Sequence, residues 1–427
     1  MKATVSEPES WKRVLEIEIP AQEVENAYEE KLTKYRKDLK IPGFRPGHVP
    51  ATIVKQRFGS AIKGEVIDDL VQKSYQTACE ENKITPVSQA KVKDIKADEG
   101  QPVRFTVETE VDPPIEIKGY NKLKIKPNPK KIKDSDVDEA VKNLQDRLAE
   151  FKDVDRPSKK GDFVRLEYLK VIVDGEEKKE VQSPNYPVEL GAESRIKDFD
   201  KGLIGHAANE VVDISVKFPK DYADSSVAGQ SGDFQIKITA VQEKVLPEIN
   251  EEFLKKVGDY KDEAALREGI RAQIEKEEID KSKNEAYNRA IDQLIKDNHF
   301  EVPPARVEAF INYMHEESMK YRRDNNPVPS LDEIKQRYEE IAVRSIKRQR
   351  IIDYIAEKEN IKATQEDVDR EIDRIAKMYN QPFDTVKQAF RKNGTTNRIR
   401  VDVREQKTLD FLINEYTPAQ ESAENKE

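Results

Sequence analysis

The first hundred residues alternate between strand-like and helix-like patterns. Leu15–Ile19 alternates apolar residues with glutamates, which is the period of a half-buried strand. Helical spacing follows, and the two glycines and three prolines of residues 41–50 interrupt it before a second helical stretch over about residues 51–82. Alternation returns over residues 103–111. Residues 1–115 therefore predict a compact α+β domain.

A connector with helical character is expected next. Lysines gather near residues 122–133, which indicates exposure to solvent. Ser135 and Asp138 have the spacing of a capping box, and apolar residues then recur on one helix face as far as Phe151. We expect this linker to span residues 116–155.

The pattern then changes to short strands. Asp174-Gly175 is a hairpin signal between two runs of strand-like residues. Further alternating runs recur at modest spacing up to about Gln242. Several short strands separated in this way indicate an antiparallel sheet, so residues 156–245 are expected to form a β domain.

Helical periodicity dominates the remainder, which we expect to form an all-helical domain over residues 246–416. Two capping boxes fall inside it, at Ser330/Glu333 and Thr364/Asp367. Residues 417–427 lack apolar periodicity and are expected to form a disordered tail. The whole chain thus predicts a multidomain α+β protein.

Composition adds expectations about the shape of the protein and about its location in the cell. Hydrophobic residues make up 36% and charged residues 37% of the 427 residues, which favours an elongated helical domain with arms over one large core. The net charge of −9 disfavours general nucleic-acid binding. The start has no apolar signal segment and no run is long enough to cross a membrane, so we expect a cytoplasmic protein. The single cysteine, Cys79, excludes an internal disulfide.

The loop that breaks the first helical pattern is the strongest candidate for a binding site. Phe44 lies beside Arg45 between two glycines, and aromatic and arginine side chains dominate interface hot spots. Basic residues are concentrated around it: Lys34, Arg36, Lys37, Lys40, Lys55, Arg57 and Lys63. This excess predicts an anionic partner such as an RNA-rich surface. The alternative is a tight turn with a solvated basic face.

Other chemistry leaves little trace. The four histidines are dispersed without metal-ligand spacing, and neither a P-loop nor G-x-G-x-x-G occurs. We therefore expect no metal and no cofactor. Cys79 lies in a helical run without a basic neighbour and is expected to be a small buried residue.

The loop residues resemble the ribosome-binding signature of bacterial trigger factors, G-F-R-x-G-x-x-P, and the order of the predicted domains resembles that family over the whole chain. The resemblance implies docking at the tunnel exit of the large ribosomal subunit, beside a ribosomal protein and rRNA. By motif, the implied ribosome-binding residues are Gly43, Phe44, Arg45, Pro46, Gly47 and His48.

The β domain resembles an FKBP-type peptidyl-prolyl isomerase. Such a site needs no acid, base or metal, because an apolar aromatic cup can favour the twisted imide, which has lost its resonance. By motif, the resemblance assigns the cup to Tyr168, Tyr186, Ile196, Phe199, Tyr222 and Phe234. The alternative for Tyr168 and Phe234 is packing in the core of the sheet.

Two departures from the isomerase pattern predict weaker activity than is typical. Lys178 stands where the family usually has phenylalanine, and Asp198 replaces the glycine before the aromatic of the pocket floor. A charge beside a site that desolvates an imide is unfavourable.

The combined prediction is an ATP-independent chaperone that binds nascent and unfolded polypeptides, with a ribosome-binding α+β domain, an FKBP-like β domain and helical arms. Met314, Met319 and Met378 are candidates for a client-binding surface, although packing is the simpler explanation for each. The resemblance also implies a homodimer off the ribosome. Two rival interpretations are a free-standing prolyl isomerase and a structural RNA-binding protein.

Overall fold

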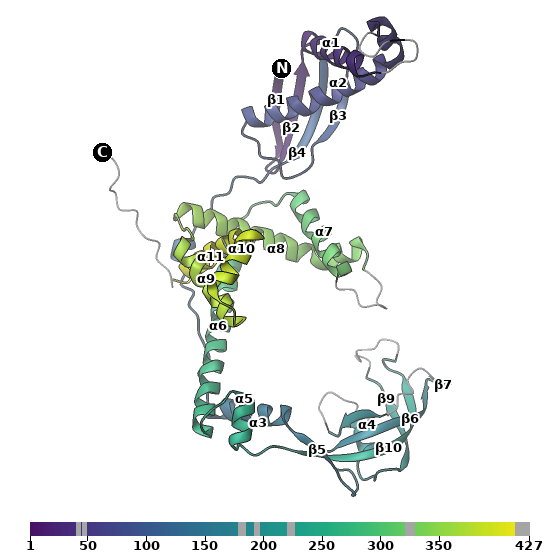
Figure 1. Cartoon of the computed structure of the whole chain (residues 1–427), viewed down its shortest axis with the longest axis vertical. Helices are drawn as coiled ribbons and strands as arrows, with labels where there is room; N and C mark the ends of the chain where they lie inside the picture. The colour runs from purple at the N-terminus through teal and green to yellow at the C-terminus, as the bar shows by residue number, and fades with distance from the viewer. Residues whose placement is uncertain are drawn as a thin grey trace, which may run out of the picture. The chain divides into compact units, whose positions relative to one another are not determined.

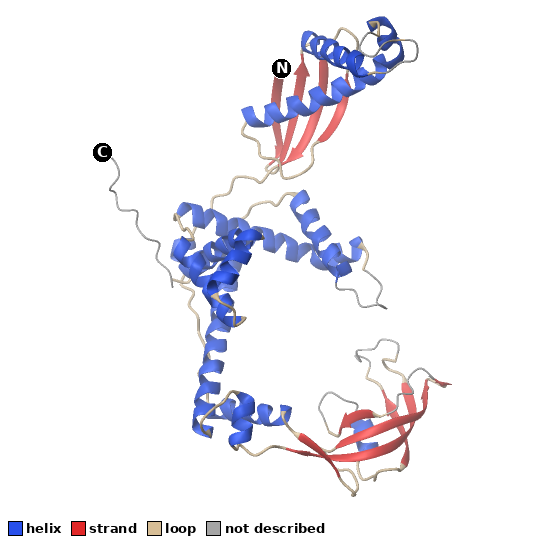
Figure 2. Cartoon of the chain, viewed as in Figure 1, coloured by secondary structure: helices blue, strands red, loops and turns tan. Residues whose placement is uncertain are grey.

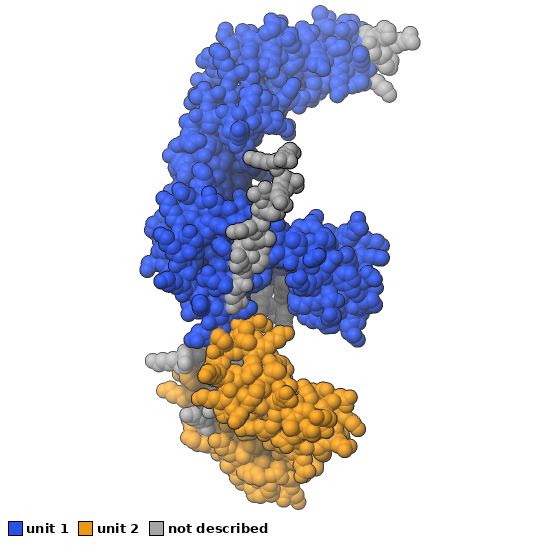
Figure 3. Space-filling model, turned by 90° about the vertical axis from the view of Figure 1, so that its left-hand side faces the viewer, with its two compact units in different colours: residues 1–128, 282–427 blue, residues 129–281 orange. Residues whose placement is uncertain are grey.

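The computed structural model describes residues 1–39, 44, 49–177, 185–191, 197–219, 227–320 and 329–414. Two compact units divide the chain: residues 1–128 with 282–427, and residues 129–281 (Figure 3). Each unit contains hydrophobic clusters of its own. The predicted mixture of antiparallel sheets with a C-terminal helical region is confirmed (Figure 2).

The N-terminal part of the first unit is an antiparallel sheet with two helices on one face (Figure 1). Its strands, in the spatial order β1-β2-β4-β3, are β1 Lys2–Glu9, β2 Lys12–Ile19, β4 Val103–Glu110 and β3 Lys91–Lys96. The helices are α1 Ala21–Asp38 and α2 Ala51–Glu81.

The register of this sheet explains its core. Leu15 pairs with Val107 and Ile17 pairs with Phe105, so the apolar members of both strands face the same side. These four residues are buried together with Val54, Ile62 and Val66 of α2. The alternation predicted for β2 and β4 is therefore the packing surface for the helices.

The connector expected near residues 122–133 has its lysines in solvent, but apolar residues in and just before it pack against the helices. Ile117 is buried, and Leu123 and Ile125 are partly buried, in a cluster with the helices of the same unit. Asn298 fixes the segment by accepting from the backbone N–H of Lys118 at 2.8 Å and donating to its carbonyl at 3.2 Å. The lysines stay in solvent while the apolar residues between them pack, which composition alone does not reveal.

The helices of the first unit after residue 282 form two clusters. The elements are the part of α6 (Glu263–Asp297) from residue 282 on, α7 Pro304–Lys320, α8 Leu331–Lys358, α9 Gln365–Met378, α10 Phe383–Lys392 and α11 Thr395–Leu412. A short 3-10 turn of the same unit, η1 Tyr120–Lys122, comes earlier in the chain. One cluster joins α6, α8 and α11, and a smaller one joins α9, α10 and α11. Both predicted capping boxes, at Ser330 and Thr364, are confirmed.

The second unit begins with a small helical cluster. It contains α3 Asp134–Arg147, α5 Glu251–Val257 and the first part of α6, which spans Glu263–Asp297. The predicted cap at Ser135 is displaced by two residues. The helix begins at Asp134, because the N–H of Lys133 donates to the carboxylate of Asp136 at 2.8 Å.

The rest of the second unit is a sheet domain built on two long strands. The described strands are β5 Glu150–Asp153, β6 Phe163–Val173, β7 Glu176–Glu177, β8 Tyr186–Glu189, β9 Val211–Lys217 and β10 Ser231–Val245. β10 pairs with β5, β6 and β9, and β6 pairs with β7 and β8, all antiparallel. Asp174 and Gly175 both have positive φ, as the predicted hairpin requires.

One short helix, α4 Lys197–Leu203, packs on this sheet. Phe199 and Leu203 of α4 are buried with Ile214 of β9. Gly202 allows the close approach, since a Cβ there would lie 2.9 Å from the side chain of Ile214. The expected domain boundaries stay a prediction, because compactness divides the chain at residues 128/129 and 281/282 instead.

Candidate functional site

Aromatic rings from different elements meet around Phe234 of β10. Its ring centroid lies 5.6 Å from that of Phe199, 6.3 Å from Tyr168 and 6.4 Å from Phe218, each in an edge-to-face arrangement. The Tyr168 ring lies a further 6.2 Å from Tyr186. These separations are those at which aromatic pairs attract each other. The rings form an aromatic cup, a name used below for Tyr168, Tyr186, Phe199, Phe218 and Phe234.

Exposure increases from one side of this cup to the other. Phe199 and Phe218 are both 8% exposed, Phe234 and Tyr168 are partly buried, and Tyr186 is 44% exposed. A surface with an apolar floor and an aromatic rim is suited to a small apolar ring. The alternative of core packing for Tyr168 and Phe234 stays open, because both are partly buried, whereas Tyr186 is the exposed member of the group.

The sheet register brings the rings together. Tyr168 of β6 pairs with Ile236, two residues after Phe234 in β10, and Tyr186 of β8 pairs with Leu166. Phe199 comes from α4 and Phe218 directly follows β9. Neighbours on one face of paired strands are within reach of aromatic side chains, so residues far apart in sequence converge here.

The structure places four of the six residues predicted for the cup: Tyr168, Tyr186, Phe199 and Phe234. Ile196 and Tyr222, like Lys178, lie outside the described residues. Sequence reasoning missed Phe218 as a member of the cup. Its position at the end of the alternating run Val212–Phe218 was the signal, because that alternation puts it on the buried face.

Asp198 does not bring its charge into the aromatic cup. Its side chain is 64% exposed and pairs with Lys201 at 3.0 Å. The carboxylate therefore stays solvated while the neighbouring Phe199 is buried. Asp200 is the buried acid of this helix, and it accepts from the backbone N–H of Gly191 at 2.9 Å.

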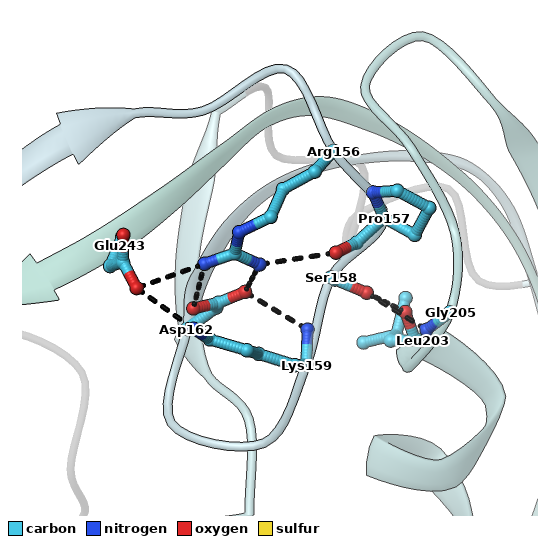
Figure 4. Close-up of polar contacts among 8 residues, drawn as sticks. All are labelled: Arg156, Pro157, Ser158, Lys159, Asp162, Leu203, Gly205 and Glu243. Carbon is cyan, nitrogen blue, oxygen red and sulfur yellow. Dashed lines mark hydrogen bonds and ion pairs between the residues drawn. The ribbon is translucent and has the colours of Figure 1, made fainter.

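Ser158, a buried residue in the loop before β6, fixes the end of α4 and hence the floor of the cup. The Ser158 hydroxyl donates to the carbonyl of Leu203 at 2.6 Å and accepts from the N–H of Gly205 at 3.2 Å (Figure 4). The N–H of Gly205 also donates to the Ser158 carbonyl at 2.8 Å. These bonds satisfy the helix terminus, which otherwise leaves carbonyls without partners.

The same loop is held by a buried carboxylate. Asp162 is 1% exposed and accepts from Arg156 at 2.6 and 3.1 Å and from the N–H of Lys159 at 2.9 Å (Figure 4). Burial acts to raise the pKa of Asp162, but the hydrogen bonds from Arg156 and Lys159 outweigh it and the pKa is lowered. The carboxylate is thus ionised and structural at neutral pH.

The second candidate site is the end of the first unit where α1 and α2 approach the predicted ribosome-binding loop. Phe44 is 38% exposed, and the other predicted residues, Gly43 and Arg45–His48, lie outside the described part of the chain. At the loop's base Arg36 donates to the carbonyl of Val49 at 3.1 Å. Val49 itself is fully buried.

An ionic network joins the two helices below this loop. Lys31 of α1 contacts Asp69 at 2.7 Å and Glu65 at 3.2 Å on α2, and the Tyr35 hydroxyl donates to Glu65. Hydrogen bonds from Tyr35 and Lys31 lower the pKa of Glu65. The helix pair therefore has fixed ends from which a binding loop can be presented.

Fewer of the predicted basic residues around the loop are free to bind a partner than their number in the sequence suggests. Lys55 is neutralised by Glu29 at 2.7 Å and lies over the ring of Tyr28. Lys34, Lys37 and Arg57 are exposed, and no ion pair of theirs is found within the described residues. Among the predicted basic residues, these three are therefore available to an anionic partner.

Other predicted features have simple outcomes. Cys79 is buried, and burial raises the pKa of its thiol, which fits the predicted inert residue. Within the described ranges no cluster of three metal-ligating side chains is found. No helix in those ranges is both long and apolar enough to cross a membrane.

Profiles of three protein families match successive parts of the chain. The profile described as Bacterial trigger factor protein (TF) matches residues 1–144, and the one described as its C-terminus matches residues 264–414. Between them, residues 154–241 match the FKBP-type peptidyl-prolyl cis-trans isomerase profile. The aromatic cup lies inside this last range.

Relatives of known family match almost the whole chain. The trigger factor of Marinobacter nauticus is 31% identical over 414 residues, which cover 97% of this chain and 95% of the relative. That of Solibacter usitatus is 30% identical and covers 97% and 99%. A solved structure, described as showing promiscuous substrate recognition in folding and assembly activities of the trigger factor chaperone, shares the fold. It has a TM-score of 0.54 at 19% identity and covers 97% of this chain and 100% of that chain.

The three profiles follow the order of the domains along the chain, and the two relatives match it almost from end to end. The chain therefore belongs to the trigger factor family, and it is a ribosome-associated chaperone that carries an FKBP-type peptidyl-prolyl isomerase domain.

Proposed function

We propose that the aromatic cup binds the proline of X-Pro segments, with Tyr168, Tyr186, Ile196, Phe199, Tyr222 and Phe234 as its contact residues. The contact of the Phe234 ring with three other rings, below an exposed Tyr186, supports this assignment. Rotation about the imide bond has a barrier of about 18–20 kcal/mol because of resonance. A desolvated apolar surface favours the twisted imide, which has lost that resonance and is less polar.

The test is prolyl turnover on a peptide, with two exposed aromatic residues of the same domain compared. Tyr186→Ala removes a rim residue that is 44% exposed, and Phe151→Ala removes one that is 45% exposed and belongs to β5. Loss of about half of an aromatic contact corresponds to roughly 1.4 kcal/mol, or about tenfold in kcat/KM. We expect this loss for Tyr186→Ala and unchanged turnover for Phe151→Ala.

Equal turnover in both variants and in the unmodified chain would refute the proposal that the aromatic cup is the catalytic site. The same assay tests the proposed weakness of the site. Lys178 stands where the isomerase family usually has phenylalanine. Lys178→Phe is expected to raise turnover, because binding the imide then no longer requires a charged side chain beside it to lose water.

We further propose that docking on the ribosome uses the Phe44 loop and contacts the large subunit at the tunnel exit, through a ribosomal protein and rRNA. Gly43, Arg45, Pro46, Gly47 and His48 complete the proposed contact. Phe44 is an aromatic side chain exposed at the end of a braced helix pair, and Lys34, Lys37 and Arg57 supply positive charge nearby. This combination suits a partner with both apolar and anionic surface.

Co-sedimentation with 70S ribosomes at increasing salt tests the docking proposal. Phe44→Ala is expected to weaken binding by about 2 kcal/mol, roughly 30-fold, as for an interface hot spot. Val92→Ala is the matched control, because Val92 is 40% exposed on β3 of the same domain and Phe44 is 38% exposed. Unimpaired co-sedimentation of Phe44→Ala would refute docking through this loop.

The helical region has large apolar side chains that are exposed to solvent, and these are candidates for binding client polypeptides. Tyr313, Met319, Met378 and Tyr379 are 57%, 47%, 61% and 67% exposed. Scattered flexible and aromatic contacts of this kind bind many unfolded chains weakly. We propose that these residues contact nascent polypeptides.

We also propose that the protein acts in the cytoplasm and that it dimerises when it is off the ribosome.

A further inference from the structure

Asp200 joins two elements that contribute to the aromatic cup. It lies in α4 directly after Phe199, which belongs to the floor of the cup, and its carboxylate accepts a hydrogen bond from the backbone N–H of Gly191 at 2.9 Å. Gly191 comes two residues after the end of β8, and the first residue of β8 is Tyr186 at the exposed rim. The hydrogen bond therefore links the helix of the floor to the strand of the rim.

The rim end of this link is itself held in place. The N–H of Leu190 donates to the carbonyl of Asp162 at 2.9 Å, and the N–H of Gly161 donates to the carbonyl of Leu190 at 2.8 Å. Leu190 is buried, and Gly191 has a φ of 85°, a left-handed conformation that favours glycine. The N–H that donates to the carboxylate in α4 is thus fixed by its own neighbours.

The same bond restrains the rotation of α4. The helix is only seven residues long, and Ser158 holds its C-terminal end (Figure 4). Bonds at one end of a helix restrain rotation about its axis less than a side-chain bond does, because the side chain lies off the axis. Successive helical residues point about 100° apart, so a rotation that moves Asp200 also moves the ring of Phe199. Holding the carboxylate therefore holds this ring in the cup.

Stability alone does not explain this carboxylate. Asp200 is 6% exposed, and its second oxygen, Oδ1, is buried without a hydrogen-bond partner among the described residues. Burying a carboxylate against a single neutral donor costs free energy that an apolar side chain of similar size would not cost. The geometry of the adjacent cup is a better reason for an acid at this position than the stability of the sheet domain.

We propose that Asp200 is a positioning residue of the prolyl site, which keeps Phe199 at a fixed distance and orientation relative to Tyr186. This inference rests on the proposed binding of proline in the aromatic cup. Contacts that form fully only around the twisted imide lower the barrier, and these contacts depend on the spacing between floor and rim. Loss of the hydrogen bond should therefore lower kcat more than it raises KM.

The test measures kcat and KM for a proline peptide with the full-length chain. Asp200→Ala removes the acceptor for the N–H of Gly191, and we expect kcat to fall about tenfold while KM changes by less than about twofold. Asp200→Asn keeps an acceptor oxygen and the size of the side chain without its charge. It should therefore keep kcat within about twofold of that of the unmodified chain.

Asp213→Ala is the matched control for the loss of a carboxylate. Asp213 is exposed on β9 of the same domain and accepts a hydrogen bond from Gln235 at 3.1 Å. Because this bond lies outside the cup, its loss should leave both kcat and KM unchanged.

Hydrogen exchange of the same variants separates positioning from a general loss of stability. In Asp200→Ala, exchange should become faster in residues 186–191 and 197–203 and stay unchanged in β6 and β10, the two long strands of the domain. The inference is overturned if Asp200→Ala keeps the kcat of the unmodified chain, or if Asp200→Asn is as slow as Asp200→Ala. Equally faster exchange in β6 and β10 would also overturn it, because the residue would then support the whole fold.

Tyr186→Ala, measured beside these variants, distinguishes the failure of this inference from the failure of the proposed function. If Tyr186→Ala lowers turnover and Asp200→Ala does not, the cup remains the prolyl site and the positioning role of Asp200 is refuted. If neither variant lowers turnover, the assignment of the cup is refuted and the positioning role is refuted with it.

Discussion

At the scale of single residues, environment decides what an acidic side chain does. Asp198 and Asp200 flank Phe199 in the same short helix, yet Asp198 is solvated and paired with Lys201 whereas Asp200 is 6% exposed. Successive helical residues differ by about 100° in direction, so one turn presents both environments. The sequence alone assigns both residues the same charge near the aromatic cup, and only their exposure separates them.

Asp162 allows a quantitative prediction at this scale. Asp162→Asn keeps the shape of the side chain but removes the charge that accepts two hydrogen bonds from Arg156. We expect the sheet domain to lose about 1–3 kcal/mol of stability at pH 7. The loss is measured by hydrogen exchange of peptides from residues 154–241 in the full chain.

The pH dependence has a definite sign. The folded pKa of Asp162 lies below its ordinary value of 3.8, so its stabilisation is present above that value and is lost as pH falls through the lowered folded pKa. The difference between Asp162→Asn and the unmodified chain should therefore shrink below about pH 4. A difference that stays constant down to pH 2, or no difference at pH 7, would contradict the structural role of this carboxylate.

At the scale of elements, strands and helices with one buried face can be predicted from the sequence, because burial makes their apolar residues periodic. Elements that stay in solvent lack this periodicity and are missed. β2 and β4 show strict alternation because one face of each is buried. β1 and β3 are the two edge strands, and all six residues of β3 are exposed, so the pattern of β3 carries no strand signal. Both edge strands form because β2 and β4 offer unpaired backbone groups, which is information from elsewhere in the chain.

The candidate sites follow the same rule. Phe234 and Tyr168 could be recognised by motif, but Phe218 joins them only through the pairing of β9 with β10. Lys55 counts as positive charge in the sequence, and Glu29 cancels it in the structure. Arg289 of α6 donates to the carbonyl of Lys126 across more than 150 residues of the chain, so no local pattern could have predicted this contact.

At the scale of the whole molecule, stability is divided among separate clusters. The sheet domain packs around Ile236 and Leu166, whereas the helices of the first unit pack around Ile291 and Ile355. No residue belongs to both clusters. A chain of this kind is not expected to unfold in one two-state transition, because loss of one core leaves the other intact.

Two matched core substitutions test this independence by calorimetry of the full chain. Ile236→Ala and Ile291→Ala each truncate an isoleucine that is at most 1% exposed, so each should cost about 2–5 kcal/mol in its own cluster. We expect Ile236→Ala to lower one thermal transition by about 8 °C or more and Ile291→Ala to lower a different one. Hydrogen exchange assigns each transition, because faster exchange should appear in residues 154–241 for the first variant and in α6, α8 and α11 for the second. If both variants lowered the same transition by the same amount, the two cores would be coupled. The prolyl site could then sense the state of the helical region, which separate cores do not allow.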